Sequence, residues 1–355
     1  MIDTLNSFVL DKNNDIKRDL ITHKRHTDNK KFDSTDLSQY DYYTIFYDIF
    51  LSPNNNKLIL IGPPLLNLKN ILLPLKISFN NYVLNNYQII EDSVTIIIYD
   101  LENQVINDYN NVDIHSKNEI SKSFIIPKNI IKIGKNVLVT IQKSNNILWI
   151  EEWIRHYKNI GVNTFIIFDN NSENQLELIE NYKENIDIFI IPTNFLYGII
   201  KSHASLFLQR SILNICLYKY CNDNFIFNFD IDELLNISKD RLEKLLKPNN
   251  YYIFNFKWVP VLNVLDTSNS YSNSYSYKDF DKSLKKITRT APKYIIHSNN
   301  TRKITIHGVD TKNKKNTSSL YFYHYKGITT NWKVYCDRLK IEKINQDELE
   351  DIKFN

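Results

Sequence analysis

The sequence predicts a mixed α/β protein in which a β-rich segment precedes a domain built around a parallel sheet. In the first part, short β-prone runs lie between Asn- and Pro-rich turns, which is typical of an antiparallel sandwich. After residue 136, apolar strand-like runs alternate with helical segments, and such alternation places helices on the faces of a parallel sheet. We therefore divide the 355 residues into a polar arm (1–40, disordered or helical), a sandwich-like module (41–132) and an α/β domain (133–355).

Apolar content and periodicity predict the individual elements. A helix over Leu148–Ile160 places Trp149, Trp153 and Tyr157 on one face, and Gly161 ends it. The other helices are expected over Gln175–Glu184, Ser205–Tyr220 and Lys239–Leu246. The strands of the module are expected over Tyr43–Leu51, Lys57–Ile61, Leu75–Phe79 and Ser93–Tyr99. The strands of the α/β domain are expected over Val137–Gln142, Thr164–Phe168, Ile186–Ile191, Phe225–Phe229, Tyr251–Val259, Ile287–His297, Thr301–His307 and Leu320–Tyr325.

Composition restricts the class of protein. The apolar fraction of 43% can supply a core, and the net charge of +4 is spread along the chain rather than gathered as in nucleic-acid binders, so we expect no nucleic-acid partner. Three cysteines, an odd number, favour a reducing compartment. The polar N-terminus and the lack of a long apolar run favour a cytoplasmic protein, and the mildly basic charge leaves peripheral membrane association open.

Two carboxylates follow a strongly apolar strand. Asp230 and Asp232 come directly after Phe225–Phe229 and are separated by one residue. Two nearby anions repel unless a cation lies between them or water screens them. Mg²⁺ or Mn²⁺ takes oxygen ligands and leaves positions for phosphate oxygens, so this pair suits the charge that develops on a diphosphate leaving group. The alternative is that Asp232 caps a following helix; the position after a buried strand favours the metal.

A longer pattern surrounds this pair. One helix carries Glu151-Glu152-Trp153 together with His156-Tyr157, and the next strand ends in the turn Phe168 to Ser172. Gln209 and Cys216 lie on the helix that precedes the strand Phe225–Phe229. After this strand, Asp230 to Leu234 has the pattern D-x-D-E-L. Over residues 140 to 235 this order resembles glycosyltransferase family 92 and the related family-2-like glycosyltransferases of GT-A fold. The resemblance implies a GT-A, Rossmann-like domain that transfers a sugar from a nucleotide donor with inversion.

The resemblance also implies roles for individual residues. Asp169, in the turn with Asn171, would contact the base or ribose of the donor, and Asp230 and Asp232 would bind metal and diphosphate. One departure concerns the first strand, which family members follow with Arg or Lys, Asn and Glu. Here the segment is Gln142 to Asn146, so the acidic residue is missing and the resemblance does not carry over a donor-base contact at this position.

Cationic and polar residues upstream complete the expected donor site. Lys201 and Arg210 could bind phosphates, since the guanidinium fork matches phosphate oxygens, and Gln209 is taken with them as a donor-binding residue. The alternative for the charged pair is an ordinary helix surface.

His324 closes an aromatic strand and is our candidate for a third metal ligand, against a role in the core. His297 and His307 are candidates for acceptor or phosphate contacts, with core packing as the alternative. An inverting transferase needs a base for the acceptor hydroxyl, and Asp310 and Glu233 are the candidates. Glu233 could instead orient the metal turn.

Three functions are weighed. The first is a metal-dependent inverting glycosyltransferase that uses Mn²⁺ or Mg²⁺. Its donor is a nucleotide sugar, with a UDP-sugar favoured, and its acceptor is a capsule, lipopolysaccharide or viral glycan. The second is transfer of another phosphate-bearing group onto a polysaccharide. The third is a non-catalytic carbohydrate-binding or assembly protein. The donor sugar, the acceptor and the oligomeric state are not determined by the sequence.

Overall fold

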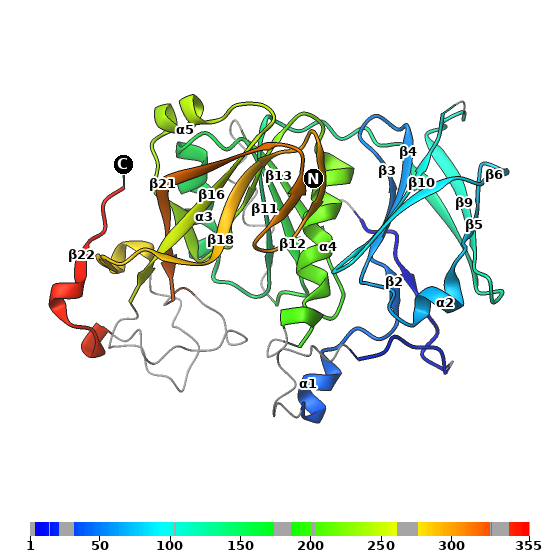
Figure 1. The fold of residues 1–355 in the computed structure, drawn as a ribbon, viewed down its shortest axis with the longest axis horizontal. Helices are drawn as coiled ribbons and strands as arrows, with labels where there is room; N and C mark the ends of the chain where they lie inside the picture. Colours follow the sequence, from blue (N-terminus) through cyan, green and yellow to red (C-terminus); the bar gives the residue numbers. More distant parts are fainter. Residues whose placement is uncertain are drawn as a thin grey trace. The chain divides into compact units, whose positions relative to one another are not determined.

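The computed structural model describes residues 4–13, 15–20, 32–102, 104–173, 186–199, 203–260, 276–326, 328 and 341–354 (Figure 1). The chain divides into two compact units, neither of them continuous in sequence. The first unit consists of Met1–Asp3, Ile133–Pro192 and Asp223–Asn355. The second consists of Thr4–Lys132 and Thr193–Asn222. The helix expected over residues 175–184 lies outside the described residues.

An eight-stranded sheet forms the centre of the described part of the first unit, in the order β13-β12-β11-β14-β18-β16-β21-β15. The four strands β11 to β14 run parallel to one another, and β16 and β21 are a further parallel pair. β18 and β15 run antiparallel to their neighbours. The strands are β11 (Asn136–Gln142), β12 (Thr164–Asp169), β13 (Asp187–Pro192), β14 (Phe225–Asn228), β15 (Glu233–Leu235), β16 (Asn250–Val259), β18 (Thr288–His297) and β21 (Lys314–Tyr325).

The sheet is mixed, whereas the sequence predicts a parallel one. The difference arises after β14. A parallel return to the neighbouring strand needs a crossover, usually a helix. The described part of the connection from β16 to β18 contains no α-helix. It contains a 3-10 turn (Tyr277–Asp279) and the strand β17 (Lys282–Leu284), which pairs with β22 (Leu349–Asp351). β18 therefore returns antiparallel between β14 and β16.

Helix α3 (Ile147–Asn159) connects β11 to β12 and carries an apolar stripe into the core of this unit. Its buried residues include Trp153, Ile154 and Tyr157, none of which exposes any surface. Asn146 is the N-cap, with its side-chain oxygen accepting from the Leu148 amide at 2.9 Å. The second helix, α5 (Lys239–Leu245), follows β15 and buries only Leu242.

The second unit contains two four-stranded antiparallel sheets that share one apolar core. One sheet has the order β3-β4-β8-β7 and the other β10-β9-β5-β6. The strands are β3 (Asp48–Leu51), β4 (Lys57–Gly62), β5 (Lys76–Phe79), β6 (Tyr82–Leu84), β7 (Tyr87–Glu91), β8 (Thr95–Asp100), β9 (Tyr109–His115) and β10 (Ser121–Pro127). The described part of this unit also contains the short pair β1 (Phe8–Val9) and β2 (Thr44–Phe46) and the helices α1 (Ser34–Ser38), α2 (Leu68–Leu72) and α4 (Phe207–Ile215). A 3-10 helix (His203–Ser205) precedes α4, and a π-helix (Cys216–Tyr220) follows it.

Two features of this unit differ from the sequence-based expectation. In the described part of residues 1–40, α1 is helical, which is one of the two expected alternatives, whereas β1 pairs with β2. Arg18 is fully buried, with Nε donating to the Pro64 carbonyl at 2.8 Å. Residues 193–222, including α4, belong to this unit although they lie within the expected α/β domain. None of the helices in the described residues combines the length and apolar character needed to cross a membrane.

His156 on α3 makes the stability of the first unit depend on pH. Its ring packs against Tyr157 and Phe354, and Nε2 lies 3.0 Å from the Leu235 carbonyl oxygen. Burial lowers the pKa of His156 to about 4, from 6.5, with the hydrogen bond opposing the shift in part. Between these pH values the unfolded chain binds the proton and the folded chain does not, so the free energy of unfolding falls as pH falls.

We predict that His156→Gln, which keeps a donor for Leu235 but does not titrate, reduces this pH dependence. The wild-type slope contributed by His156 is at most about 1.4 kcal/mol per pH unit between pH 6.5 and 4. Urea denaturation of both proteins across this range measures the difference. Equal slopes for the two proteins would show that His156 is not the titrating group.

Candidate metal and donor site

The carboxylate-bearing turn connects β14 to β15. β14 ends at Asn228, and β15 begins at Glu233, so Asp230 and Asp232 lie in the turn between two buried strands. β15 pairs antiparallel with β21 and places Glu233 opposite His324. The Tyr325 amide donates to the Asp232 carbonyl at 2.8 Å, which ties the turn to the end of β21.

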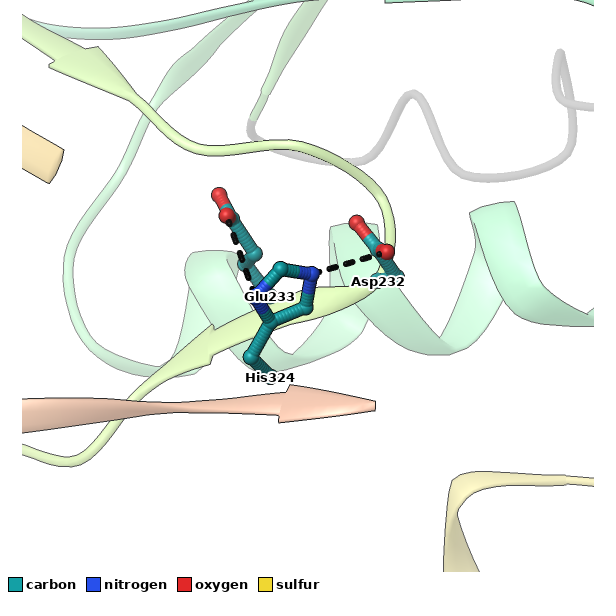
Figure 2. Close-up of side chains that lie close together, drawn as sticks. All are labelled: Asp232, Glu233 and His324. Carbon is teal, nitrogen blue, oxygen red and sulfur yellow. Dashed lines mark hydrogen bonds and ion pairs between the residues drawn. The ribbon is translucent and has the colours of Figure 1, made fainter. Parts of the chain in front are cut away.

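Three side chains converge at this point, as Figure 2 shows. His324 Nε2 lies 3.1 Å from Asp232 Oδ2, and His324 Nδ1 lies 4.0 Å from Glu233 Oε1. One ligand atom from each of the three residues lies within 4.8 Å of the others. Both acids are 2% exposed. Carboxylate oxygen and imidazole nitrogen are ligands of divalent cations such as Mn²⁺, so this donor set fits a cation site.

Asp230 has a different partner. The ammonium of Lys293, on β18, lies 2.8 Å from Asp230 Oδ2 and 3.2 Å from Glu233 Oε2. Lys293 is 1% exposed, whereas the Asp230 side chain is 30% exposed. Although burial opposes it, the two carboxylates raise the pKa of Lys293 and keep it protonated. The structure therefore joins Asp232 to His324 and Asp230 to Lys293.

Glu233 connects these two pairs. Its Oε2 accepts from the Asp230 amide at 2.8 Å as well as from Lys293, while Oε1 lies on the side of His324. Burial raises the pKa of the Glu233 carboxyl to about 8, with the Lys293 ammonium opposing the rise and the two neighbouring aspartates adding to it. Bonds to the backbone and side chains of the turn favour an orienting role for Glu233.

Buried aromatic side chains hold the backbone of the turn. Trp153 Nε1 donates to the Asp230 carbonyl at 3.0 Å, and the Tyr157 hydroxyl donates to the Glu233 carbonyl at 3.0 Å. The Tyr277 hydroxyl donates to the Ile231 carbonyl between them. Indole and phenol groups have few rotatable bonds and reach from a packed ring, so they fix the positions of these carbonyls.

The helix motif identified in the sequence therefore has a structural explanation. Trp153 and Tyr157 are one helical turn apart on α3, so both reach the same turn. Glu152 binds the segment that carries Tyr277: its carboxylate accepts from the Tyr277 amide at 3.1 Å and from the Ser276 hydroxyl at 2.9 Å. Three residues of α3 thus support the carboxylate turn directly or through Tyr277.

Asp169 is the centre of a second polar cluster, at the carboxyl end of β12. Its Oδ1 accepts from Gln142 Nε2 and from the Ser172 hydroxyl. Burial raises the pKa of Asp169, and these hydrogen bonds oppose the shift. Gln142 ends β11, which pairs with β12 on one side and with β14 on the other. Asp169 thus lies two strands from the carboxylate turn, about 10 Å across the sheet. Asn171 follows, exposed and with a positive φ of 53°.

The other sequence-predicted residues that the structure describes have partners of their own. Lys201 lies outside the described residues. Gln209 and Arg210 belong to the second unit. There the Tyr197 hydroxyl donates to the Gln209 side chain, and the Arg210 side chain donates to the Ala204 carbonyl. Asp310 is half exposed on β20 (Val309–Thr311), 3.9 Å from Arg302. His297 packs on Phe225, and His307 is exposed. Their expected roles stay predictions.

Lys293 and Tyr277 were not predicted from the sequence. A signal for Lys293 is present, because it is a charged residue directly before the apolar run Tyr294–Ile296 of a strand that is otherwise buried there. Tyr277 has no such signal, since it ends a Ser/Asn/Tyr-rich stretch in which every tyrosine looks alike.

Comparison with protein families matches residues 138–355 to glycosyltransferase family 92. The match covers more than half of the chain, and the chain belongs to glycosyltransferase family 92. It is therefore a glycosyltransferase, as the sequence motifs predict.

Comparison with curated proteins gives no match. Among solved structures, S. aureus TarS 1-349 is 12% identical with a TM-score of 0.34, and the match covers 54% of this chain and 61% of that one. HddC from Yersinia pseudotuberculosis is 13% identical with a TM-score of 0.32, covering 55% and 94%. TM-scores of this size do not establish a common fold.

We predict that Tyr157→Phe destabilises the protein by about 1–3 kcal/mol, because the buried Glu233 carbonyl loses a donor and the Leu235 amide, 3.3 Å from the same hydroxyl, loses an acceptor. Tyr251→Phe, on β16, is the matched control, with an expected change within about 0.5 kcal/mol. Urea denaturation measures both. Equal stabilities of the two variants would exclude a supporting role for the Tyr157 hydroxyl.

Lys293→Met is predicted to cost about 3–5 kcal/mol, since it leaves buried carboxylate charge without its partner. Glu233→Gln removes the charge from the other side of the pair. In a double-mutant cycle the combined variant should lose at least about 1 kcal/mol less than the sum of the single losses. Additive losses, measured by urea denaturation, would mean that the two groups do not stabilise each other.

Proposed function

We propose that this glycosyltransferase is metal-dependent and inverting, has a GT-A arrangement, and transfers a sugar from a nucleotide-sugar donor to a surface glycan of a cell or virus. The observation that carries the proposal is the approach of His324 Nε2 to Asp232 Oδ2 at 3.1 Å, between residues 92 positions apart in the chain. Asp232 lies beyond the carboxyl end of the buried parallel strand β14, and His324 lies near the carboxyl end of β21. Ligands of α/β sheets bind at this edge.

The strand order supports the GT-A arrangement. Four parallel strands, β13-β12-β11-β14, form one side of the sheet, and the antiparallel strand β18 follows directly. Asp169 and the carboxylate turn both lie at the carboxyl edge of the parallel half. A donor bound along this edge would meet Asp169 with its base or ribose and the turn with its diphosphate.

The donor set favours Mn²⁺ over Mg²⁺. Asp232 and Glu233 offer carboxylate oxygens, and His324 offers a ring nitrogen. Mg²⁺ prefers oxygen ligands only, whereas Mn²⁺ also accepts imidazole. Asp232 and His324 would hold the cation, and Glu233 would orient the turn through the Asp230 amide. When bound, the cation would stabilise negative charge on the departing diphosphate.

The remaining steps depend on residues of the chain. Asp230 is partly exposed, and its other oxygen could accept hydrogen bonds from the donor while Lys293 fixes its position. A base must take the proton from the acceptor hydroxyl. Glu233 and Asp310 remain the candidates; Glu233 is buried and already hydrogen-bonded, which favours its orienting role and leaves Asp310 as the residue to test.

We predict that Mn²⁺ together with UDP raises the melting temperature, and that Asp232→Asn removes the shift. Binding at 100-fold above Kd would stabilise the folded protein by about 2.7 kcal/mol. Asp187→Asn, at the amino end of β13 and therefore at the opposite edge of the sheet, is the matched control and should keep the shift. Thermal denaturation with UDP, GDP and CMP, each with and without Mn²⁺, measures these effects.

Several outcomes would contradict the proposal. Lack of a shift with all three nucleotides would argue against a nucleotide-sugar donor, and an unchanged shift in Asp232→Asn would argue against this metal site. A product with a phosphorus-containing adduct would instead identify transfer of a phosphate-bearing group. Binding of glycan without metal, unaffected by Asp232→Asn, would identify a carbohydrate-binding protein.

A further inference from the structure

A lysine lies beside the candidate metal site without taking part in the cluster of acids. Lys326 directly follows β21, in a turn, and comes two residues after His324. The Lys326 ammonium lies 4.8 Å from the centroid of the Trp258 ring, a cation–π contact. The side chain is partly exposed.

Trp258 connects this ammonium to the metal site. Trp258, on β16, is paired in register with His324 on β21. Their rings stack at a centroid distance of 4.6 Å and an interplanar angle of 29°. Successive contacts therefore connect the Lys326 ammonium, the Trp258 ring, the His324 imidazole and the Asp232 carboxylate.

The charges of the cluster leave a need for such a cation. Lys293 already pairs with Asp230 and Glu233, and a divalent ion would lie against the Asp232 carboxylate. A diphosphate that binds this ion therefore brings negative charge that the cluster does not balance. No ion pair within the described residues involves Lys326, whose ammonium contacts the face of the Trp258 ring.

We infer that Lys326 binds the diphosphate of the donor, and that Trp258 is a positioning residue that places the Lys326 ammonium next to the metal-bound phosphate. This inference rests on the proposed function, because it assigns the diphosphate of the same donor. A lysine suits the role, since its ammonium is a compact charge with three donors, and contact with an aromatic face leaves N–H groups free for phosphate oxygens.

Inorganic pyrophosphate is the probe that isolates this subsite. Calorimetric titration of pyrophosphate in the presence of Mn²⁺ should give about tenfold or more weaker binding for Lys326→Ala than for the wild type. Lys326→Arg should bind within about threefold of the wild type, because guanidinium also pairs with phosphate. Lys244→Ala, which removes a positive charge from the exposed surface of α5, is the matched control and should bind as the wild type does.

Mn²⁺ affinity, measured without pyrophosphate by electron paramagnetic resonance, should be the same in Lys326→Ala and the wild type. This readout shows whether the variant has kept its fold and metal site. Uridine binding should also be unchanged, while UDP should weaken as pyrophosphate does. Equal pyrophosphate affinity in Lys326→Ala and the wild type, or equal weakening of uridine and UDP, would overturn the inference.

The failure of this inference and that of the proposed function are distinguishable. If the wild type binds pyrophosphate with Mn²⁺ through Lys326 but binds none of UDP, GDP and CMP, the subsite stands and the nucleotide-sugar donor is excluded. If UDP binds with Mn²⁺ and Asp232→Asn abolishes this binding, yet Lys326→Ala does not alter it, the donor stands and the subsite is excluded. If the wild type binds neither pyrophosphate nor any nucleotide, both are excluded.

Discussion

The candidate site depends on hydrogen bonds between buried aromatic side chains and the backbone of one short turn. Trp153, Tyr277 and Tyr157 donate to the carbonyls of Asp230, Ile231 and Glu233. A buried carbonyl without a donor costs as much as a lost hydrogen bond, so these contacts stabilise the turn in one conformation. Because side-chain direction follows the backbone, they also determine where the carboxylates of the turn lie. The helix α3 thus supports the candidate metal site without contributing a residue to its donor set.

The carboxylates of Asp230, Asp232 and Glu233 repel one another when they are ionised, and Lys293 reduces this repulsion. Its ammonium lies between Asp230 and Glu233 and neutralises one charge within the protein. Asp232 is then left with His324, a neutral or positive partner. The two pairs differ in composition: one joins a carboxylate to a lysine ammonium, and the other joins a carboxylate to an imidazole, two groups that can both bind a cation. The partly exposed Lys326 adds a further positive charge at the face of the Trp258 ring.

How well the fold could be predicted differs between the parts of the chain. The strands β11, β12 and β14 are continuous apolar runs because both faces of a parallel strand are buried, and the sequence shows them within one residue. In the second unit, β9 and β10 are polar on one face and contain Asn, Asp, Ser or Lys, and they were not predicted. Their pairing with each other and with β5 makes them strands, and this pairing has no local signature.

The sequence by itself determined the strand that ends in Asp230 and Asp232, the helix face of Trp153 and Tyr157, and the family. These features are local, since periodicity and short spacings specify them within one element. Only the tertiary structure decided which residues meet at the turn: His324 reaches Asp232 across 92 positions, and Lys293 reaches Asp230 across 63. It also decided that residues 193–222 belong with the second unit. The physical reason is that strand order and register depend on how apolar faces pack over the whole sheet, which no local pattern contains.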